Sequence, residues 1–480
     1  MRRTKIVATL GPASDKPANL TAMIEAGVDV VRVNYSHDTQ ESHARRIATV
    51  RKIAKKLGRE IAIMADLQGP KIRLEGFRHG PIELEEGDDF VIDATLAPDG
   101  GDERHVGVTY KDLPGDVKPG DTLLVDDGRI MLQVDRVRGP CIETVVMIGG
   151  ELSNHKGINR QGGGLSAKAL TRKDRADLRH ALEQGVDYIA VSFPRSGEDI
   201  DTARKLIQKA DSTAAIIAKI ERAEAVENAE EIIRAADGVM IARGDLGVEI
   251  GEPALPPVQK RLIRLARSLH RTVITATQMM NSMIDNPMPF RAEVFDVANA
   301  VLDGTDAVML SGETSVGKYP IEVVRAMARI CVGSEEKWIG GSNRGVPDDH
   351  FDRVDQAIAM STMYCANRVG ATAIAALTET GSTSLWMSRM DSTIPIFALS
   401  PNTGTLRKVA LYRGVHPVYF DSSKVPYTEL TAMVLNELKA RGAVKAGDKV
   451  IVTKGDLMGF SGGTNGMKIV VVDQFVEHVG

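Results

Sequence analysis

Eight short apolar runs alternate with longer amphipathic segments in this 480-residue chain, and that alternation constrains the fold more than any other feature. Most of the runs are continuously apolar, as expected of parallel strands that are buried on both faces. They are Lys5–Leu10, Val28–Tyr35, Ile61–Gln68, Tyr188–Phe193, Ile216–Glu221, Gly238–Asp245, Thr272–Gln278 and Ala307–Glu313. The segments between them with helical length and pattern include Ala18–Ala26, Ser42–Leu57, Lys173–Gln184 and Pro257–His270. Eight strand–helix units with right-handed crossovers predict an α/β fold built on a (β/α)8 barrel.

The alternation is interrupted once, between about residues 69 and 169. Short alternating runs such as Asp121–Val125 and Ile130–Val137 replace the helices there, and turn residues such as Asp127-Gly128 separate them. The stretch is too long for a loop, so it predicts a small antiparallel β-barrel domain inserted after the third barrel strand. We assign residues 70–169 to this domain and residues 1–69 and 170–340 to the barrel. At the mouth of a barrel, such an insertion is placed to act as a lid.

A second change of composition begins near residue 340. The polar, glycine-rich segment Gly340–Asp349 is typical of a linker, and a helix (Arg353–Val369) and a strand (Ala373–Leu377) follow it. Strand–helix alternation then continues to the end. Residues 341–480 therefore predict a C-terminal domain with an open α/β sheet.

Composition and charge narrow the functional class. The formal net charge is −4, with no basic excess that would indicate nucleic acid or a membrane surface as a partner. The three cysteines are far apart, which argues against a disulfide framework and favours a reducing cytoplasm. Nothing resembles a signal peptide, and no apolar stretch is long enough to span a bilayer. We therefore expect a cytoplasmic enzyme.

Polar residues gather at the ends of the predicted strands, where two residues that are two positions apart share a face. Five strands carry such sets: Arg32, Asn34 and Ser36; Lys219 and Glu221; Arg243 and Asp245; Thr275 and Thr277; Ser311 and Glu313. The C-terminal ends of barrel strands are where barrel enzymes carry out their chemistry. All five sets are therefore expected to face the barrel mouth.

Two of these residues, Glu221 and Asp245, suggest a metal site. No His or Cys accompanies them, and hard carboxylate oxygens favour Mg²⁺ or Mn²⁺ over Zn²⁺. Two protein ligands leave positions for water and substrate oxygens. The alternative is that Glu221 only forms a salt bridge with Lys219 or Arg222.

A lysine and an arginine complete the predicted chemistry. Lys219 beside a divalent cation would stabilise a phosphoryl group in transfer or an enolate, because both develop negative charge on oxygen. Arg32 offers a planar fork suited to phosphate. The glycine turn in Ala242–Gly247 follows a strand, and a helical turn after it would present backbone N–H groups to a carboxylate or phosphate.

Taken together, these segments resemble those of pyruvate kinases, and the resemblance covers the whole chain. The matching segments are Thr4–Val7, Gly11–Ser14, Arg32–His37, Ile217–Glu221, Ala242–Gly247, Ala276–Met280, Asn286-Pro287 and Asp306–Thr314. The run from Lys219 to Glu221 and the stretch around Thr277 are highly specific to that family. The resemblance implies transfer of the phosphoryl group of phosphoenolpyruvate to ADP, which gives pyruvate and ATP.

The resemblance also implies roles for individual residues. Glu221 and Asp245 would hold magnesium, Lys219 would stabilise both the moving phosphoryl group and the enolate, and Arg32 would grip the phosphoryl group. Gly244, Asp245 and Thr277 would line the site for the carboxylate end of the substrate.

Further roles follow from the same resemblance. Thr277 would lie near the carbon that is protonated, with a water relay through Ser311 and Glu313. Asn34, His37, Arg73 and Lys156 would bind the nucleotide, and Lys156 would arrive from the lid.

The chain departs from many pyruvate kinases at their potassium site. Asn34, Ser36 and Asp66 are present, but Leu67 occupies the position of a threonine ligand, and Lys71 stands where potassium-dependent members carry Glu. The Lys71 ammonium would supply the missing positive charge, so we predict activity that does not require K⁺. The alternative is that Lys71 only faces solvent.

A cluster of hydroxyls in the C-terminal domain suits a phosphate, and the resemblance implies that it forms an effector site. Thr378, Thr380, Ser382, Thr383 and Ser384 lie between a strand and a helix, a suitable place for a phosphate. An ordinary helix cap is the alternative. The late loop Ser461–Gly466 would close over the site, and it lacks the Arg and Trp associated with a bisphosphate. The expected activator is therefore a sugar monophosphate or a nucleotide monophosphate, and the resemblance implies a homotetramer.

Two other functions remain open at this point. One is a magnesium-dependent aldolase or lyase barrel that handles an enolate, which would share Glu221 and Asp245 but would not need the lid. The other is a non-catalytic sensor that binds phosphorylated metabolites through the C-terminal domain.

Overall fold

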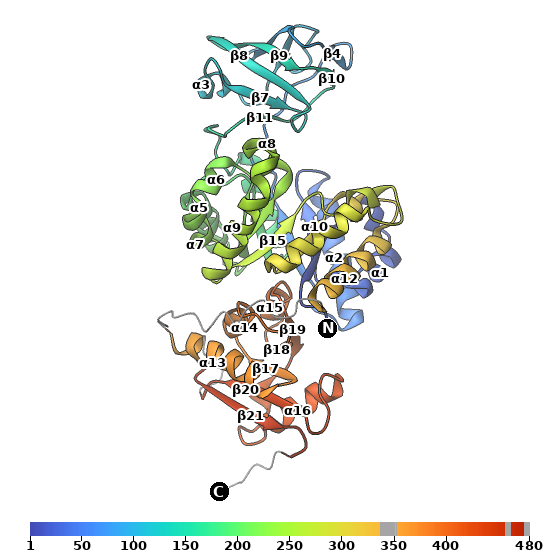
Figure 1. Cartoon of the computed structure of the whole chain (residues 1–480), viewed down its shortest axis with the longest axis vertical. Coiled ribbons are helices and arrows are strands. Elements are labelled where there is room, and N and C mark those ends of the chain that lie inside the picture. The colour runs from blue at the N-terminus through green and yellow to red at the C-terminus, as the bar shows by residue number, and fades with distance from the viewer. Residues whose placement is uncertain (337–350, 352, 457–461, 475–480) are drawn as a thin grey trace.

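The chain forms three domains that lie in a row along its longest axis (Figure 1). The computed structural model describes residues 1–336, 351, 353–456 and 462–474. The inserted β domain is at the top of Figure 1, the barrel is in the middle, and the C-terminal domain is at the bottom. The predicted linker Gly340–Asp349 and the predicted boundary at residues 340/341 lie outside the described residues, and the remaining domain limits stay predictions.

The middle domain is a closed barrel of eight parallel strands, which confirms the predicted (β/α)8 fold. In spatial order the strands are β1 (Lys5–Thr9), β16 (Ala307–Leu310), β15 (Thr272–Ala276), β14 (Gly238–Ala242), β13 (Ala215–Ile220), β12 (Tyr188–Val191), β3 (Ala62–Asp66) and β2 (Val30–Asn34). Each observed strand begins within two residues of its predicted start. All eight end earlier than predicted, and β14 stops at Ala242 because a helix begins at the next residue.

Helices cover the outside of the barrel. They are α1 (Pro17–Ala26), α2 (Gln40–Leu57), α4 (Arg172–Glu183), α5 (Gly197–Lys209), α6 (Ala223–Glu227), α7 (Ala229–Ala235), α8 (Arg243–Ile250), α9 (Leu255–Ser268), α10 (Arg291–Asp303), α11 (Gly312–Ser315) and α12 (Pro320–Glu336). Local sequence explains where several begin and end. Thr171 and Asp174 form a reciprocal capping box at the start of α4, and Gly58 adopts a left-handed conformation just after α2.

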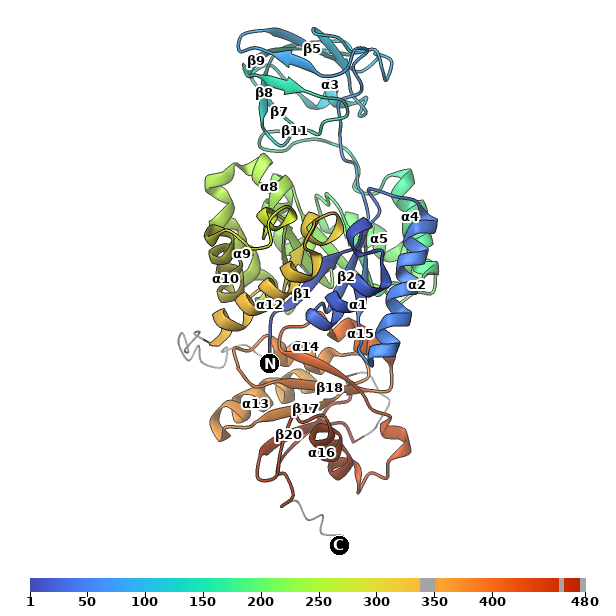
Figure 2. The same cartoon turned by 90° about the vertical axis from the view of Figure 1, so that its right-hand side faces the viewer.

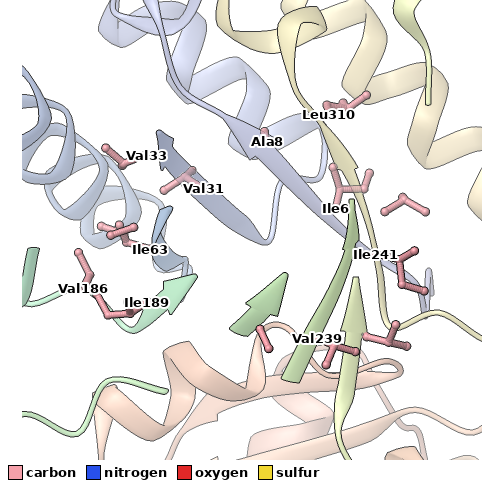
Figure 3. Close-up of a cluster of buried hydrophobic side chains, with 14 of the residues drawn as sticks. Ile6, Ala8, Val31, Val33, Ile63, Val186, Ile189, Val239, Ile241 and Leu310 are labelled. Carbon is pink, nitrogen blue, oxygen red and sulfur yellow. The ribbon is translucent and has the colours of Figure 1, made fainter. Parts of the chain in front are cut away.

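The barrel strands bury side chains on both faces. One set packs outward against the helices, as for Ile6, Ala8, Val31, Val239 and Ile241 in Figure 3. The intervening residues fill the barrel interior: Val7, Val30, Ala62, Met64, Tyr188, Ala190, Ile217, Met240, Ile274, Ala276, Ala307 and Met309. These two sets define which residues at the strand ends continue the inward face.

The inserted domain follows β3, as predicted. It contains β4 (Ile82–Leu84), β5 (Asp89–Asp93), β6 (His105–Gly107), α3 (Leu113–Asp116), β7 (Thr122–Val125), β8 (Ile130–Arg138), β9 (Cys141–Ile148), β10 (Gly150–Leu152) and β11 (Ile158–Arg160). Six strands form a sheet in the order β11-β7-β8-β9-β5-β6, which is antiparallel except between β5 and β6. Isolated bridges from Arg73 to Gly157 and from Leu74 to Val108 link its two edges, so the sheet curls into a barrel.

The C-terminal domain is a five-stranded open sheet with helices, again as predicted. Its elements are α13 (Val354–Val369), β17 (Ala373–Leu377), α14 (Ser382–Ser388), β18 (Ile396–Ser400), α15 (Thr403–Val409), β19 (Val415–Tyr419), α16 (Leu430–Ala440), β20 (Lys449–Lys454) and β21 (Gly466–Val471). The order is β19-β18-β17-β20-β21, and only β21 runs antiparallel to its neighbour. This domain lies below the barrel, at the opposite end from the lid (Figure 2).

Candidate active site

Arg32, Asp66 and Lys219 come together inside the barrel mouth. Arg32 and Asp66 continue the inward faces of β2 and β3, and Lys219 continues that of β13. Arg32 Nε lies 2.6 Å from Asp66 Oδ2, and Lys219 Nζ lies 3.2 Å from Asp66 Oδ1. Glu221 follows β13 and lies 2.8 Å from the same ammonium. Arg32, Lys219 and Glu221 thus lie at the barrel mouth, as strand parity predicted, and Asp66 joins them there.

This cluster is almost fully removed from water. Asp66 and Glu221 are each 1% exposed and Lys219 is 8% exposed. Burial alone would lower the pKa of Lys219, but the carboxylates of Asp66 and Glu221 outweigh burial and raise it, so the ammonium stays charged. Burial alone would raise the pKa of Asp66, but Arg32 and Lys219 outweigh it and lower that pKa. The site therefore holds fixed charges of both signs in a medium of low polarity.

Glu221 and Asp245 form an acidic pair that suits a divalent cation. Asp245 lies in the first turn of α8, and its charge adds to burial in raising the pKa of Glu221. Lys219 opposes that shift only in part. A bound cation would relieve the repulsion between the two carboxylates. Among the described residues, no group of three or more His, Cys, Asp or Glu is gathered for a metal, so further ligands would be water or substrate oxygens.

Thr277 and Gly244 meet through a hydrogen bond. The Gly244 N–H donates to Thr277 Oγ1 at 2.8 Å, and that hydroxyl donates to the Ala276 carbonyl at 2.7 Å. Thr277 has φ of +64°, which is rare for a β-branched residue. The segment predicted as a glycine turn with a helical turn after it is itself helical, because α8 begins at Arg243 and includes Gly244 and Gly247.

Ser311 and Glu313 lie at the end of β16 and in α11. Glu313 is fully buried, and its carboxylate accepts the N–H of Ser311 at 2.6 Å and the N–H of Met280 at 3.1 Å. Both oxygens therefore join the loop after β15 to the loop after β16. The relay through Ser311 and Glu313 stays a prediction.

The prediction that all five polar sets share the inward face is wrong for Arg243 and Thr275. Both continue outward-facing positions of their strands, as Ile241 and Val273 show. Arg243 forms an ion pair of 2.6 Å with Asp296 of α10, and Thr275 Oγ1 lies 3.0 Å from Thr305 Oγ1. The parity rule assumed that each strand continues to its last polar residue. Because β14 ends at Ala242 and β15 ends at Ala276, Asp245 and Thr277 lie beyond the strands and reach the mouth through turns.

Sequence reasoning missed Ser192. Its hydroxyl accepts a hydrogen bond from Lys219 Nζ at 2.7 Å and donates to the Leu67 carbonyl at 2.6 Å. Ser192 is two residues after Ala190, an inward-facing residue of β12. The parity rule that identified Arg32 would have identified it as well.

The four predicted nucleotide residues come from two domains. Asn34 ends β2 and the exposed His37 follows it, both at the barrel mouth. Arg73 and Lys156 lie on two adjacent segments of the inserted domain, where the Leu74 N–H donates to the Lys156 carbonyl at 2.9 Å. Lys156 pairs there with Asp126 at 2.8 Å, and Arg73 donates to the His155 carbonyl.

The predicted monovalent-cation pocket is only partly assembled. Asn34 Oδ1 accepts the Ser36 N–H at 3.1 Å, while the ion pairs of Asp66 within the described part of the chain are with Arg32 and Lys219. Lys71 lies 3.3 Å from Asp245 Oδ1. Its observed ion pair is thus with the acidic pair and not with Asp66.

The hydroxyl cluster of the C-terminal domain lines a small cavity of about 30 Å³. Thr378, Thr380, Ser382 and Thr383 contribute to it, with Gly462, Gly463 and Thr464 on the facing loop. Thr383 Oγ1 lies 2.9 Å from Thr464 Oγ1, and among the described residues the buried Ser384 hydroxyl has no hydrogen-bond partner. The loop expected to close over this cluster does so, although Ser461 lies outside the described residues.

Comparison with protein families finds two matching regions. Residues 1–324 match the family described as pyruvate kinase, barrel domain, and residues 356–470 match pyruvate kinase, alpha/beta domain. The chain belongs to the pyruvate kinase family. It is 56% identical over 477 residues to pyruvate kinase II of Salmonella typhimurium, covering 98% of this chain and 99% of the relative. It is 54% identical to a pyruvate kinase of Haemophilus influenzae, covering 95% and 96% of the two chains.

A more distant pyruvate kinase, from Geobacillus stearothermophilus, is 40% identical over 99% of this chain and 81% of its own length. The predicted phosphotransferase class is thus confirmed, and neither the aldolase or lyase alternative nor the non-catalytic sensor is supported. Pyruvate kinases generally use Mg²⁺. Within the described residues, no helix has both the length and the apolar character that crossing a membrane demands.

Proposed function

We propose that this chain transfers the phosphoryl group of phosphoenolpyruvate to ADP, giving pyruvate and ATP. The observation that carries the proposal is the buried cluster of Arg32, Lys219 and Glu221 around Asp66. Two cations fixed by carboxylates before substrate arrives do not need to reorganise when negative charge develops on the substrate.

Each residue of the proposed site has a role that follows from its position. Glu221 and Asp245 would hold Mg²⁺ or Mn²⁺, and the bound cation would supply positive charge to stabilise the phosphoryl group and the enolate. Arg32 grips the phosphoryl group, and Lys219 neutralises charge on the phosphoryl group and on the enolate oxygen. Gly244, Asp245 and Thr277 hold the carboxylate end, and water ordered by Thr277, Ser311 and Glu313 delivers the proton to carbon.

The lid completes the nucleotide site. Asn34 and His37 belong to the barrel, whereas Arg73 and Lys156 belong to the inserted domain. Closure of the lid over the mouth brings the two pairs together and excludes water. Transfer to ADP is then favoured over hydrolysis.

A lysine variant tests the proposal. Lys219→Met should lower kcat for pyruvate formation from phosphoenolpyruvate and ADP by at least about 100-fold, the scale of losing one preorganised charge. Lys318→Met is the matched control, because Lys318 is 68% exposed and pairs only with Asp285 within the described residues. Wild-type rates in Lys219→Met would overturn the proposal, as would a lack of activity in the unaltered protein.

We also propose that the activity does not require K⁺, because Leu67 offers no side-chain oxygen and Lys71 adds a positive charge near the site. Rates measured without K⁺ or Na⁺ should rise less than about twofold when K⁺ is added. Lys71→Glu should show a larger rise. Strong stimulation of the unaltered protein by K⁺ would refute this.

The hydroxyl cluster around Thr378, Thr380, Ser382, Thr383 and Ser384 supports an activator site for a sugar or nucleotide monophosphate. Its hydroxyls and the loop with Thr464 suit a single phosphate group. Ribose 5-phosphate, glucose 6-phosphate and AMP should be titrated at low phosphoenolpyruvate. At least one should shift the substrate response, and Thr383→Ala should abolish that shift. No effect from any of them would count against the site.

We propose a cytoplasmic homotetramer. Met288, Phe290 and Phe295 are 73%, 61% and 71% exposed near the start of α10, and Ile469 is exposed on the outer strand β21. Exposed apolar groups of this kind are typical of interfaces. Sedimentation should give a mass of four chains, and Phe295→Asp should lower it.

A further inference from the structure

One buried carboxylate outside the predicted site connects the lid to the segment that follows Glu221. Glu249 lies one helical turn after Asp245 in α8 and is only 3% exposed. Its Oε2 accepts the N–H of Ala223 at 3.0 Å, two residues after Glu221. Its Oε1 lies 3.4 Å from Nδ2 of Asn159 in β11 of the lid.

The backbone adds contacts to the same connection. The Glu249 carbonyl accepts the N–H of Gly162 at 2.9 Å, in the segment where the chain returns from the lid to the barrel. Nearby, the buried Arg222 donates to the Leu165 carbonyl at 3.1 Å, and Glu224 accepts the N–H of Gly164. The returning stem of the lid is therefore held along its length by residues that follow Glu221.

Both stems of the lid converge at this point. A cavity of about 20 Å³, room for a single water, is lined by Ile72 on the outgoing stem, Asn159 and Leu165 on the returning stem, and Asp245 and Glu249 of α8. The neighbouring Phe193 donates its N–H to Glu221 Oε2 at 2.9 Å. The Arg222 guanidinium lies over the Phe193 ring, 5.6 Å from its centroid.

We propose that Glu249 is a positioning residue for phosphoryl transfer. It holds the returning stem of the lid against the segment that follows Glu221. This inference rests on the proposed function. Burial raises the pKa of Glu249 to about 7, so a carboxyl is kept at this site although its charged form is costly there. Because of this connection, the position of the lid over the nucleotide and the position of the Glu221 carboxylate depend on each other.

Two side-chain truncations distinguish the contact of Glu249 with Ala223 from its contact with Asn159 of the lid. Glu249→Ala removes both, so kcat should fall by about tenfold or more, and both the KM for ADP and the Mg²⁺ concentration for half-maximal rate should rise. Asn159→Ala removes only the lid end. It should raise the KM for ADP severalfold and leave the Mg²⁺ requirement unchanged. This difference separates positioning from a general loss of structure.

Two further variants complete the design. Glu249→Gln keeps an acceptor for Ala223 and should restore kcat to within about threefold of the unaltered protein. Glu252→Ala is the matched control, since Glu252 is exposed three residues later. Should Glu249→Ala fail to fold, Glu249→Gln and Asn159→Ala carry the test.

Thermal melts accompany each assay. If Glu249→Ala lowers only the melting temperature, with the kinetics of Glu252→Ala, or if Asn159→Ala leaves the KM for ADP unchanged, the positioning role is wrong. The unaltered protein is assayed first, so that absence of phosphoryl transfer there refutes the proposed function and not the role of Glu249.

Discussion

At the scale of single residues, Asp66 has a larger part than its sequence position indicated. It was predicted as one ligand of a monovalent-cation pocket. Its two oxygens lie 2.6 Å from Arg32 Nε and 3.2 Å from Lys219 Nζ, and Ser192 Oγ lies 3.4 Å from it. One buried carboxylate thus orients both cations of the proposed site.

Asp66→Asn should therefore disturb both stability and rate. Lys219 would keep its ion pair with Glu221, but Arg32 would lose its ion pair with Asp66, so the free energy of unfolding should fall by about 3 kcal/mol. The value of kcat should fall at least about tenfold. Urea unfolding and initial rates measure the two effects.

Asp15→Asn is the control, because Asp15 pairs with Arg46 at the surface and is 45% exposed. Its loss should cost less than about 1 kcal/mol and leave the rate unchanged. Equal effects of the two substitutions would show that Asp66 has no special part.

At the scale of elements, the backbone conformation just after each barrel strand determines which side chains reach the barrel mouth. Within β15, Ile274 and Ala276 face inward and Val273 faces outward, so simple alternation would turn Thr277 outward. The chain instead takes φ of +64° at Thr277, which brings its hydroxyl to the N–H of Gly244. The strained backbone at this point thus brings together two residues of the proposed site.

Thr277→Gly should separate fold from function. Relief of left-handed strain, about 1–3 kcal/mol, should roughly offset the lost hydrogen bond and the added chain entropy of glycine. The melting temperature should therefore change little, while kcat falls at least about tenfold. Thr277→Ser keeps the hydroxyl and should retain most of the rate. Full activity in Thr277→Gly would remove Thr277 from the site.

At the scale of the whole molecule, the C-terminal domain closes the barrel at the end opposite the lid (Figure 2). Leu411, after α15, is fully buried and packs with the side chains that fill the barrel interior. The Tyr188 hydroxyl donates to the Lys408 carbonyl at 2.7 Å, and Arg389 pairs with Asp306 in the same buried interface. The two domains thus share part of one core.

Leu411→Ala should weaken that shared core. A buried Leu→Ala change leaves a cavity and costs about 2–5 kcal/mol. Leu302→Ala is the control, because Leu302 is 46% exposed, and it should cost less than about 1 kcal/mol. Chemical denaturation measures both. A similar small effect from both would show that the domains are stable separately.

Lys5 predicts a pH dependence at the same interface. Lys5 is 3% exposed, and its ammonium donates to the Val415 carbonyl at 2.5 Å. Burial lowers the pKa of Lys5 from 10.5 to about 8. The positive charges of Arg2 and Arg59 add to this shift, and the carboxylates of Asp29 and Glu335 oppose it. Between these values the unfolded chain binds more protons, so this group makes stability rise with pH. Below pH 8 the folded state carries a costly buried charge.

Lys5→Met should remove that cost. At pH 7 the variant should gain up to about 3 kcal/mol, less about 1 kcal/mol for the lost hydrogen bond. The gain should shrink as the pH approaches 10.5, where the unfolded lysine also loses its proton. Unfolding free energies at several pH values test this, and a gain that does not depend on pH would contradict it.

The eight barrel strands, the inserted domain and the open C-terminal sheet could all be predicted from the sequence. The sequence also determined the inward position of Arg32, Lys219 and Glu221. These features follow from local periodicity, since strand and helix repeats are properties of neighbouring residues.

Tertiary structure alone decided the rest of the site. Asp245 and Thr277 arrive through turns whose backbone angles the periodicity does not encode. Asp66 joins two cations from other strands, Lys71 meets Asp245, and Glu249 links the lid to the barrel. Each of these contacts joins residues far apart in the chain, so only packing brings them within hydrogen-bonding distance.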